Sequence, residues 1–129
     1  MHTFYLQTCD GDLIAEVRIA ENSLTMAVQQ AIDNNIDLSD ADFQGQNLDS
    51  LLAAGAQLNR ANFSQSSLVG ADFRGAQLKD ASFAYADLTN ATFTNSSLNL
   101  LTDFTGALMT DTSYLPGRNN PNFTGLRRP

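Results

Sequence analysis

Large apolar residues recur at every fifth position through the middle of the chain. Two residues before most of them stands Ala or Ser, and the remaining positions are mainly polar. A period of five fits neither the 3.6-residue repeat of an amphipathic helix nor the two-residue repeat of a strand, and it predicts a repeat architecture. The apolar positions are Leu38, Phe43, Leu48, Leu58, Phe63, Leu68, Phe73, Leu78, Phe83, Leu88, Phe93 and Leu98.

These units resemble the pentapeptide-repeat family, whose consensus is roughly A-(D/N)-L-x-x. Units 41–45, 71–75 and 86–90 match it closely, and the resemblance covers about residues 36–115. It implies that each unit forms one side of a square coil and that four units complete a turn. The expected fold is therefore mainly β: a right-handed quadrilateral β-helix of about four coils over residues 37–115.

Stacking of such coils at the strand spacing of about 4.8 Å would place residues twenty apart in common interior columns, such as Phe43, Phe63 and Phe83. Unit 51–55 departs from the pattern, and we expect Leu51 to point inward and Leu52 to be covered by the N-terminal segment. After residue 98 the phase slips by one, with later centres at 104, 109 and 114. One inserted residue near 100–101, and a bulge there, are predicted.

Residues 1–36 are predicted to cap the first coil with a β-hairpin and a helix, because exposed coil ends would template association. Alternating strands are joined by Cys9–Asp12, whose Asp-Gly centre predicts a type I′ turn. Ser23 can cap the helix, and Asn34-Asn35 can end it. This leader resembles the front end of small phage and prophage members of the family. Residues 116–129 are predicted to be an irregular tail, in which Phe123 and Leu126 plug the last coil.

The sequence contains few residues of the types that usually act in catalysis. The single histidine, His2, stands at the terminus, Cys9 stands beside a tight turn, and no metal-ligand spacing or phosphate-binding glycine motif is present. We therefore expect no enzyme activity, no cofactor and no metal. One cysteine excludes an internal disulfide and indicates a reducing compartment. Without a signal-peptide pattern or a long apolar run, a cytoplasmic protein that does not contact membranes is expected.

Charge is concentrated near the start of the chain. The formal net charge is −7: residues 1–50 carry −8, residues 51–115 carry −2 and the basic tail carries +3. An acidic protein is poorly suited to bind nucleic acid directly and better suited to meet a basic surface. The candidate partner-binding patch consists of Asp10, Asp12, Glu16, Glu21, Asp33, Asp37, Asp40, Asp42 and Asp49.

The resemblance implies a function, since several members of the family are taken to mimic DNA. The prediction is a non-enzymatic DNA mimic that binds and inhibits or modulates a DNA-handling enzyme through a basic groove. The enzyme would be a host defence complex such as a CRISPR effector or restriction enzyme, if the chain is of phage type, or DNA gyrase. No C-terminal dimer helix is evident, so a monomer or weak dimer is expected.

Two alternatives stay open. A β-helical scaffold could bind a protein partner through the outward apolar residues Val69, Tyr85, Leu100 and Leu108, without DNA mimicry. An acidic surface could also serve only to keep the solenoid soluble and monomeric. Duplex DNA carries about one charge per 1.7 Å, so the repeats alone fall well short of a duplex, and mimicry centred on the acidic N-terminal third is the form that is predicted.

Overall fold

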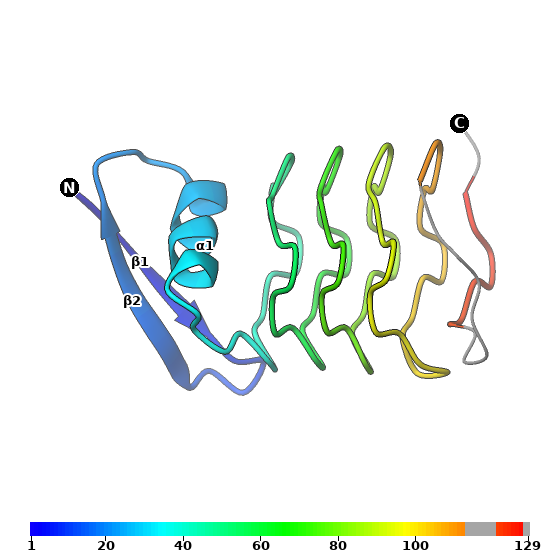
Figure 1. Cartoon of the computed structure of the whole chain (residues 1–129), viewed down its shortest axis with the longest axis horizontal. Coiled ribbons are helices and arrows are strands. Elements are labelled where there is room, and N and C mark those ends of the chain that lie inside the picture. Colours follow the sequence, from blue (N-terminus) through cyan, green and yellow to red (C-terminus); the bar gives the residue numbers. More distant parts are fainter. Residues whose placement is uncertain (113–120, 128–129) are drawn as a thin grey trace.

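A computed structural model of the chain describes residues 1–112 and 121–127 and shows a rod that is capped at its N-terminal end (Figure 1). The named elements are β1 (His2–Gln7), β2 (Leu13–Ile19) and α1 (Leu24–Asp33), and the coils follow them. β1 and β2 pair antiparallel, and α1 lies between this hairpin and the first coil (Figure 1). The predicted right-handed quadrilateral β-helix with its hairpin-and-helix cap is confirmed. Within the described residues, no helix is long and apolar enough to cross a membrane.

The coils are joined by parallel bridges between residues twenty apart, such as Asp42 with Asn62. Asn62 donates its N–H to the carbonyl of Ala41 (2.8 Å) and accepts from the N–H of Phe43 (2.8 Å). Between two sides the chain turns a corner, and each corner from residue 40 to residue 95 places its second residue at positive φ. This conformation favours Gly, Asn and Asp, which explains why these residues are frequent at the corners.

The interior is filled by the predicted columns. Phe43, Phe63 and Phe83 stack with ring centroids 5.1–5.2 Å apart, and Phe73 meets Phe63 and Phe83 edge to face. Most of the small residues two positions before the centres are buried as well, so the core is continuous. The aromatic pairs add to the stabilisation that burial of their apolar area provides.

Unit 51–55 follows the expectation only in part. Leu51 is fully buried and replaces the missing central side chain, as predicted. The prediction that the N-terminal segment covers Leu52 is wrong, because its side chain is 58% exposed. The cap meets the backbone at this position instead: the N–H of Leu52 donates to Oε1 of Gln29 on α1 (3.0 Å).

The cap also satisfies the backbone of the other sides that it covers. The N–H of Asp42 donates to the carbonyl of Gln7 at the end of β1 (2.8 Å), and Oγ1 of Thr25 on α1 donates to the carbonyl of Asn47 (3.4 Å). With the Gln29 contact, three sides of the first coil therefore have partners in the cap. This protects an edge that would otherwise template association with another chain.

The hairpin turn differs from its prediction. Thr8 donates its N–H to the carbonyl of Asp12 (2.8 Å) and accepts from the N–H of Gly11 (2.9 Å). Gly11 has φ +89°, whereas Asp10 is not at positive φ, so a type I′ turn is wrong. Because residue 8 pairs with residue 12, the loop has three residues, and its last one adopts the left-handed conformation typical of such loops.

The predicted helix ends are confirmed. Oγ of Ser23 accepts the N–H of Met26 (3.2 Å), which caps the start of α1. At the other end Asn35 has φ 58°, and the N–H of Ile36 donates to the carbonyl of Ala31 (3.0 Å). This is the left-handed stop expected from Asn34-Asn35.

The far end of the rod confirms one prediction and corrects another. Ser82 bridges to Asp103, twenty-one residues on, so the inserted residue after position 98 is real. The irregular tail predicted for 116–129 is wrong for 121–127, where Asn122 bridges to Asp103 and Phe123 stacks on Phe104 (5.2 Å). Residues 121–125 follow the repeat with proline at the small inward position, which hid the unit in the sequence. The expected centre Tyr114 and the expected stop at 116–117 lie outside the described residues.

Candidate interaction surface

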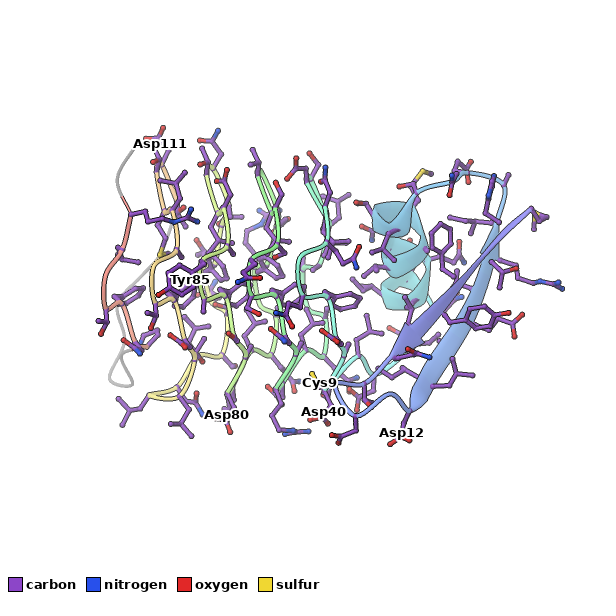
Figure 2. The ribbon with its side chains drawn as sticks, turned by 180° about the vertical axis from the view of Figure 1, so that it is seen from behind. Cys9, Asp12, Asp40, Asp80, Tyr85 and Asp111 are labelled. Atoms are coloured by element: carbon purple, nitrogen blue, oxygen red, sulfur yellow. The ribbon has the colours of Figure 1, made fainter. Side chains whose placement is uncertain are left out.

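One longitudinal edge of the rod collects the corner residues of successive coils. The corners at 39–40, 59–60 and 79–80 stack, because Asp40 donates its N–H to the carbonyl of Asn59 (2.9 Å) and Arg60 donates to that of Lys79 (2.8 Å). Figure 2 shows Asp12, Asp40 and Asp80 along this edge, with Cys9 beside Asp40. The edge therefore joins the hairpin of the cap to the third coil.

The hairpin turn is fastened to the first corner of the coil by a backbone hydrogen bond, in which Cys9 donates its N–H to the carbonyl of Asp40 (3.0 Å). Partial burial raises the pKa of the Cys9 thiol, and the negative charges of Asp42, Asp10 and Asp40 raise it further. Asp40 and Asp42 thus lie near enough to the hairpin turn to act on this thiol together with Asp10, although they are distant from it in sequence. A thiol with a raised pKa stays protonated at neutral pH and is a weak nucleophile.

Arg60 is the one arginine in the stacked corner positions 40, 60 and 80. Its Nε and Nη2 donate to the two oxygens of Asp40 (2.8 and 3.1 Å), and this bond lowers the pKa of the Asp40 carboxyl. The same bond raises the pKa of Arg60, and the negative charges of Asp80 and Asp37 raise it by smaller amounts. Both partners are about half exposed, so the pair contributes little stability.

The alternating charges of Asp40, Arg60 and Asp80 would allow a ladder of ion pairs along this edge, but only its first step is formed. Within residues 1–112 and 121–127, the ion pairs include none between Arg60 and Asp80. Oδ1 of Asp80 accepts instead from Nδ2 of Asn99 (2.5 Å), and the N–H of Asp80 donates to Oδ1 of Asn99 (3.0 Å). Asp80 therefore forms no ion pair in the described part of the chain.

We call this edge the acidic ridge. Arg60 and Lys79 stand in the same corners, so the ridge has a formal net charge of −4. The carboxylates of Asp37 and Asp42 each accept the backbone N–H two residues on (2.9 and 3.1 Å), which orients them locally. The ridge consists of Asp10, Asp12, Asp37, Asp40, Asp42 and Asp80.

Four of the nine acidic residues predicted as a patch lie apart from the ridge. Asp49 accepts from Oγ of Ser67 (2.5 Å) and from a backbone N–H, which is a structural role. The other three are Glu16, Glu21 and Asp33. On β2, Oε1 of Glu16 lies 3.7 Å from Nε of Arg18, and on α1 the carboxylate of Asp33 accepts from Nε2 of Gln29. Glu21 follows β2, whose last residue pairs with His2, so it lies at the end of the hairpin opposite the turn.

The structure thus brings together Asp10, Asp12, Asp37, Asp40 and Asp42, and adds Asp80, which the sequence patch omitted. The signal for Asp80 was present in the sequence as the twenty-residue column that contains Asp40 and Arg60. Binding through these residues stays a prediction.

Of the outward apolar residues named from the sequence, Tyr85 and Leu100 are 56% and 67% exposed, whereas Val69 and Leu108 are half-buried. Leu101, which was not among them, is 69% exposed and stands next to Leu100 at the inserted corner. Sequence reasoning located the insertion but did not show that both leucines would face solvent.

Two features of the described residues bear on whether a metal ion or a small molecule could bind. No group of three or more His, Cys, Asp or Glu in the described ranges could hold a metal ion. A pocket between α1 and the first coil, lined by Ile32, Asn35 and Ile36 with residues 54–57, has a volume of about 80 Å³. That is well below the roughly 300 Å³ at which pockets for small-molecule ligands begin.

The fold and this surface define a β-helical scaffold of the kind that serves protein interaction. A family model described as pentapeptide repeats matches residues 56–95 in eight copies. Residues 56–95 are therefore pentapeptide repeats. No curated protein sequence matches the chain.

Solved structures of pentapeptide-repeat proteins resemble the chain. The protein alr5209 from Nostoc PCC 7120 has a TM-score of 0.58 at 24% identity, over 81% of this chain and 93% of its own, and it shows the same fold. Rfr23 from the cyanobacterium Cyanothece 51142 has a TM-score of 0.47 at 26% identity, over 74% of this chain and 58% of its own. HetL from Nostoc sp. PCC 7120 is a protein involved in heterocyst differentiation regulation. It has a TM-score of 0.47 at 33% identity, over 61% of this chain and 34% of its own. The chain thus spans little more than half of Rfr23 and a third of HetL.

Proposed function

We propose that this protein is an acidic interaction protein whose ridge occupies the basic, nucleic-acid-binding groove of a protein partner. The observation that carries the proposal is the gathering of six carboxylates on one edge, from the hairpin turn to the third coil. A line of like charge attracts a basic groove over long range and speeds the encounter.

The charge density of the ridge supports mimicry of one strand rather than of a duplex. From the hairpin turn to Asp80 the ridge spans three layer spacings, or about 15 Å at the strand separation. One DNA strand carries a charge every 3.4 Å, which gives about four charges over that length, whereas a duplex carries about nine. The ridge has a formal net charge of −4, so it can stand in for the phosphates of a single strand.

Local hydrogen bonds favour the same role. Asp37 and Asp42 each use one carboxylate oxygen to accept a backbone N–H, which fixes the side chain and leaves the other oxygen for a partner. Charge-assisted bonds from Arg or Lys to such preorganised carboxylates are stronger than neutral ones. The partners to test first are those that the family resemblance implies: DNA gyrase, and defence enzymes such as a CRISPR effector or a restriction enzyme.

A second candidate is a scaffold that binds through apolar side chains without electrostatics. The observation that favours it is the exposure of Tyr85 and Leu100. Ionic strength separates the two functions, because a charge-led complex weakens steeply as salt rises and an apolar complex does not.

The test is a pull-down from bacterial lysate at low and high salt, followed by elution with a short DNA duplex. The ridge variant carries Asp12→Asn, Asp37→Asn and Asp42→Asn, since asparagine keeps the local hydrogen bonds and removes only charge. The matched control carries Glu16→Gln, Glu21→Gln and Asp33→Asn, which removes the same charge off the ridge.

We expect the wild-type chain to capture a DNA-handling enzyme, and we expect high salt or duplex DNA to release it. The control variant should capture the same enzyme, and the ridge variant should not. Capture that is indifferent to salt and equal for the two variants would contradict the proposal and favour the apolar scaffold.

A further inference from the structure

The corner at 99–101 is built differently from its neighbours. It has three residues where the others have two, and none of them is at positive φ. The left-handed conformation that disfavours bulky side chains is therefore absent, and leucine is sterically allowed at the tip. Leu100 and Leu101 project here side by side in the sequence, at 67% and 69% exposure.

The tip is held firmly at both ends. Thr102 is fully buried and donates from Oγ1 to the carbonyl of Leu78 (2.9 Å), while its N–H donates to the carbonyl of Asn99 (3.1 Å). The N–H of Asn99 donates to Oγ1 of Thr102 (3.0 Å), and the N–H of Leu101 donates to Oδ1 of Asn99 (3.2 Å). Such a loop loses little conformational freedom when it binds, so its apolar area can contribute fully to affinity.

The same tip is continuous with the acidic ridge. Asn99 is bonded in both directions to Asp80, the last carboxylate of the ridge (2.5 and 3.0 Å). In Figure 2 the yellow corner near residue 100 follows directly after the labelled Asp80 on that edge. Two exposed leucines thus stand at the end of a line of negative charge.

We infer that Leu100 and Leu101 form an apolar anchor for a partner protein that sets an apolar pocket at the end of its basic groove. The ridge would steer and align this partner, and the leucines would fix the position at which it stops. The inference rests on the proposed function, because charge complementarity along the ridge is what assigns a basic surface to the occupant. It adds a determinant of specificity that charge alone does not supply.

Two synthetic peptides of equal length and charge serve as probes: one repeats Lys-Leu-Leu-Lys and the other repeats Lys-Ser-Ser-Lys. Their affinities are measured by fluorescence anisotropy at low salt. We expect the wild-type chain to prefer the leucine peptide by about tenfold or more, as burial of two partly exposed leucines allows. The double variant Leu100→Ser, Leu101→Ser should lose this preference and keep its affinity for the serine peptide.

The matched control is Leu52→Ser, which removes a leucine of similar exposure away from the ridge and should keep the preference. A preference that survives in the double variant, or that is lost equally in the control, would overturn the anchor. Equal binding of both peptides by the wild type would overturn the anchor alone, whereas binding of neither would overturn the ridge as well. Dimerisation in sedimentation analysis that the double variant abolishes would assign the leucines to a second copy, which also overturns the inference.

Discussion

The interior of the rod and its acidic ridge obey different constraints. Inside, Phe63 touches aromatic rings above, below and across, and every replacement must fit the same square space. On the ridge, the backbone demands only a left-handed corner, and Asp40, Arg60 and Asp80 meet that demand with opposite charges. The coil therefore fixes the position of each ridge side chain but not its chemical type. Residues at the corners can thus vary to set binding specificity without disturbing the fold.

The largest expected effect of a substitution lies in the interior. Phe63→Ala should lower the free energy of unfolding by about 3–5 kcal/mol, because it removes a buried ring and leaves a cavity. The control Leu52→Ala should change it by about 0.5 kcal/mol or less, since that side chain is mostly exposed. Urea denaturation followed by circular dichroism measures both. Similar losses for the two variants would contradict the contrast between interior and surface.

An intermediate effect is expected where a corner touches a neighbour. Gly106 has φ +65°, and a Cβ built there would clash with the ring of Tyr85 in the preceding coil. Gly106→Ala should therefore cost about 2–3 kcal/mol, from backbone strain and from displacement of the ring.

Gly45→Ala is its matched control, because that corner has φ +71° with no atom near the new Cβ, and it should cost only about 1 kcal/mol. Thermal melts of both variants, and of Gly106→Ala combined with Tyr85→Ala, measure the contact. If the Tyr85 change does not relieve part of the Gly106→Ala loss, the clash is not its cause.

The smallest expected effect belongs to the ion pair on the ridge. Arg60 lowers the pKa of the Asp40 carboxyl, so the pair stabilises the fold above the usual carboxyl pKa of about 4 and loses this contribution as pH falls through the lowered value. Asp40→Asn should lower the melting temperature at pH 7 by at most about 5 °C, because both side chains are half exposed. This difference should shrink as the pH falls below the usual carboxyl pKa. A difference that does not shrink, or that Asp12→Asn reproduces at pH 7, would contradict the assignment to the pair.

The extent to which the sequence predicts the structure follows the same division. The interior columns, the buried Leu51 and the insertion after residue 98 could be predicted, because a square interior accepts few residue types and keeps their spacing. The hairpin turn type and the exposure of Leu52 could not, since the first depends on the register of β1 against β2 and the second on how α1 sits on the first coil. The unit at 121–125 could not be predicted either, because proline stands where the other units have a small inward residue.

The site was less predictable than the fold for a physical reason. Asp10 and Asp42 are far apart in sequence, and the backbone hydrogen bonds that join residues 7–9 to residues 40–42 bring their carboxylates together. Net charge along the sequence placed Glu21 and Asp33 in the same group, although the hairpin and α1 carry them elsewhere. Asp80 joins the ridge through coil stacking, which charge counting along the chain does not register.

The most direct test of the central claim is a competition measurement with the DNA-handling enzyme recovered in the salt-sensitive pull-down. A fluorescent DNA is bound to the purified enzyme, and the protein is titrated in while anisotropy reports the bound DNA. The account predicts complete displacement by the wild-type chain and by the off-ridge control, with the Asp12, Asp37 and Asp42 to Asn variant at least about tenfold weaker. Displacement that is equal for all three proteins, or a complex in which DNA and protein bind the enzyme together, would contradict it.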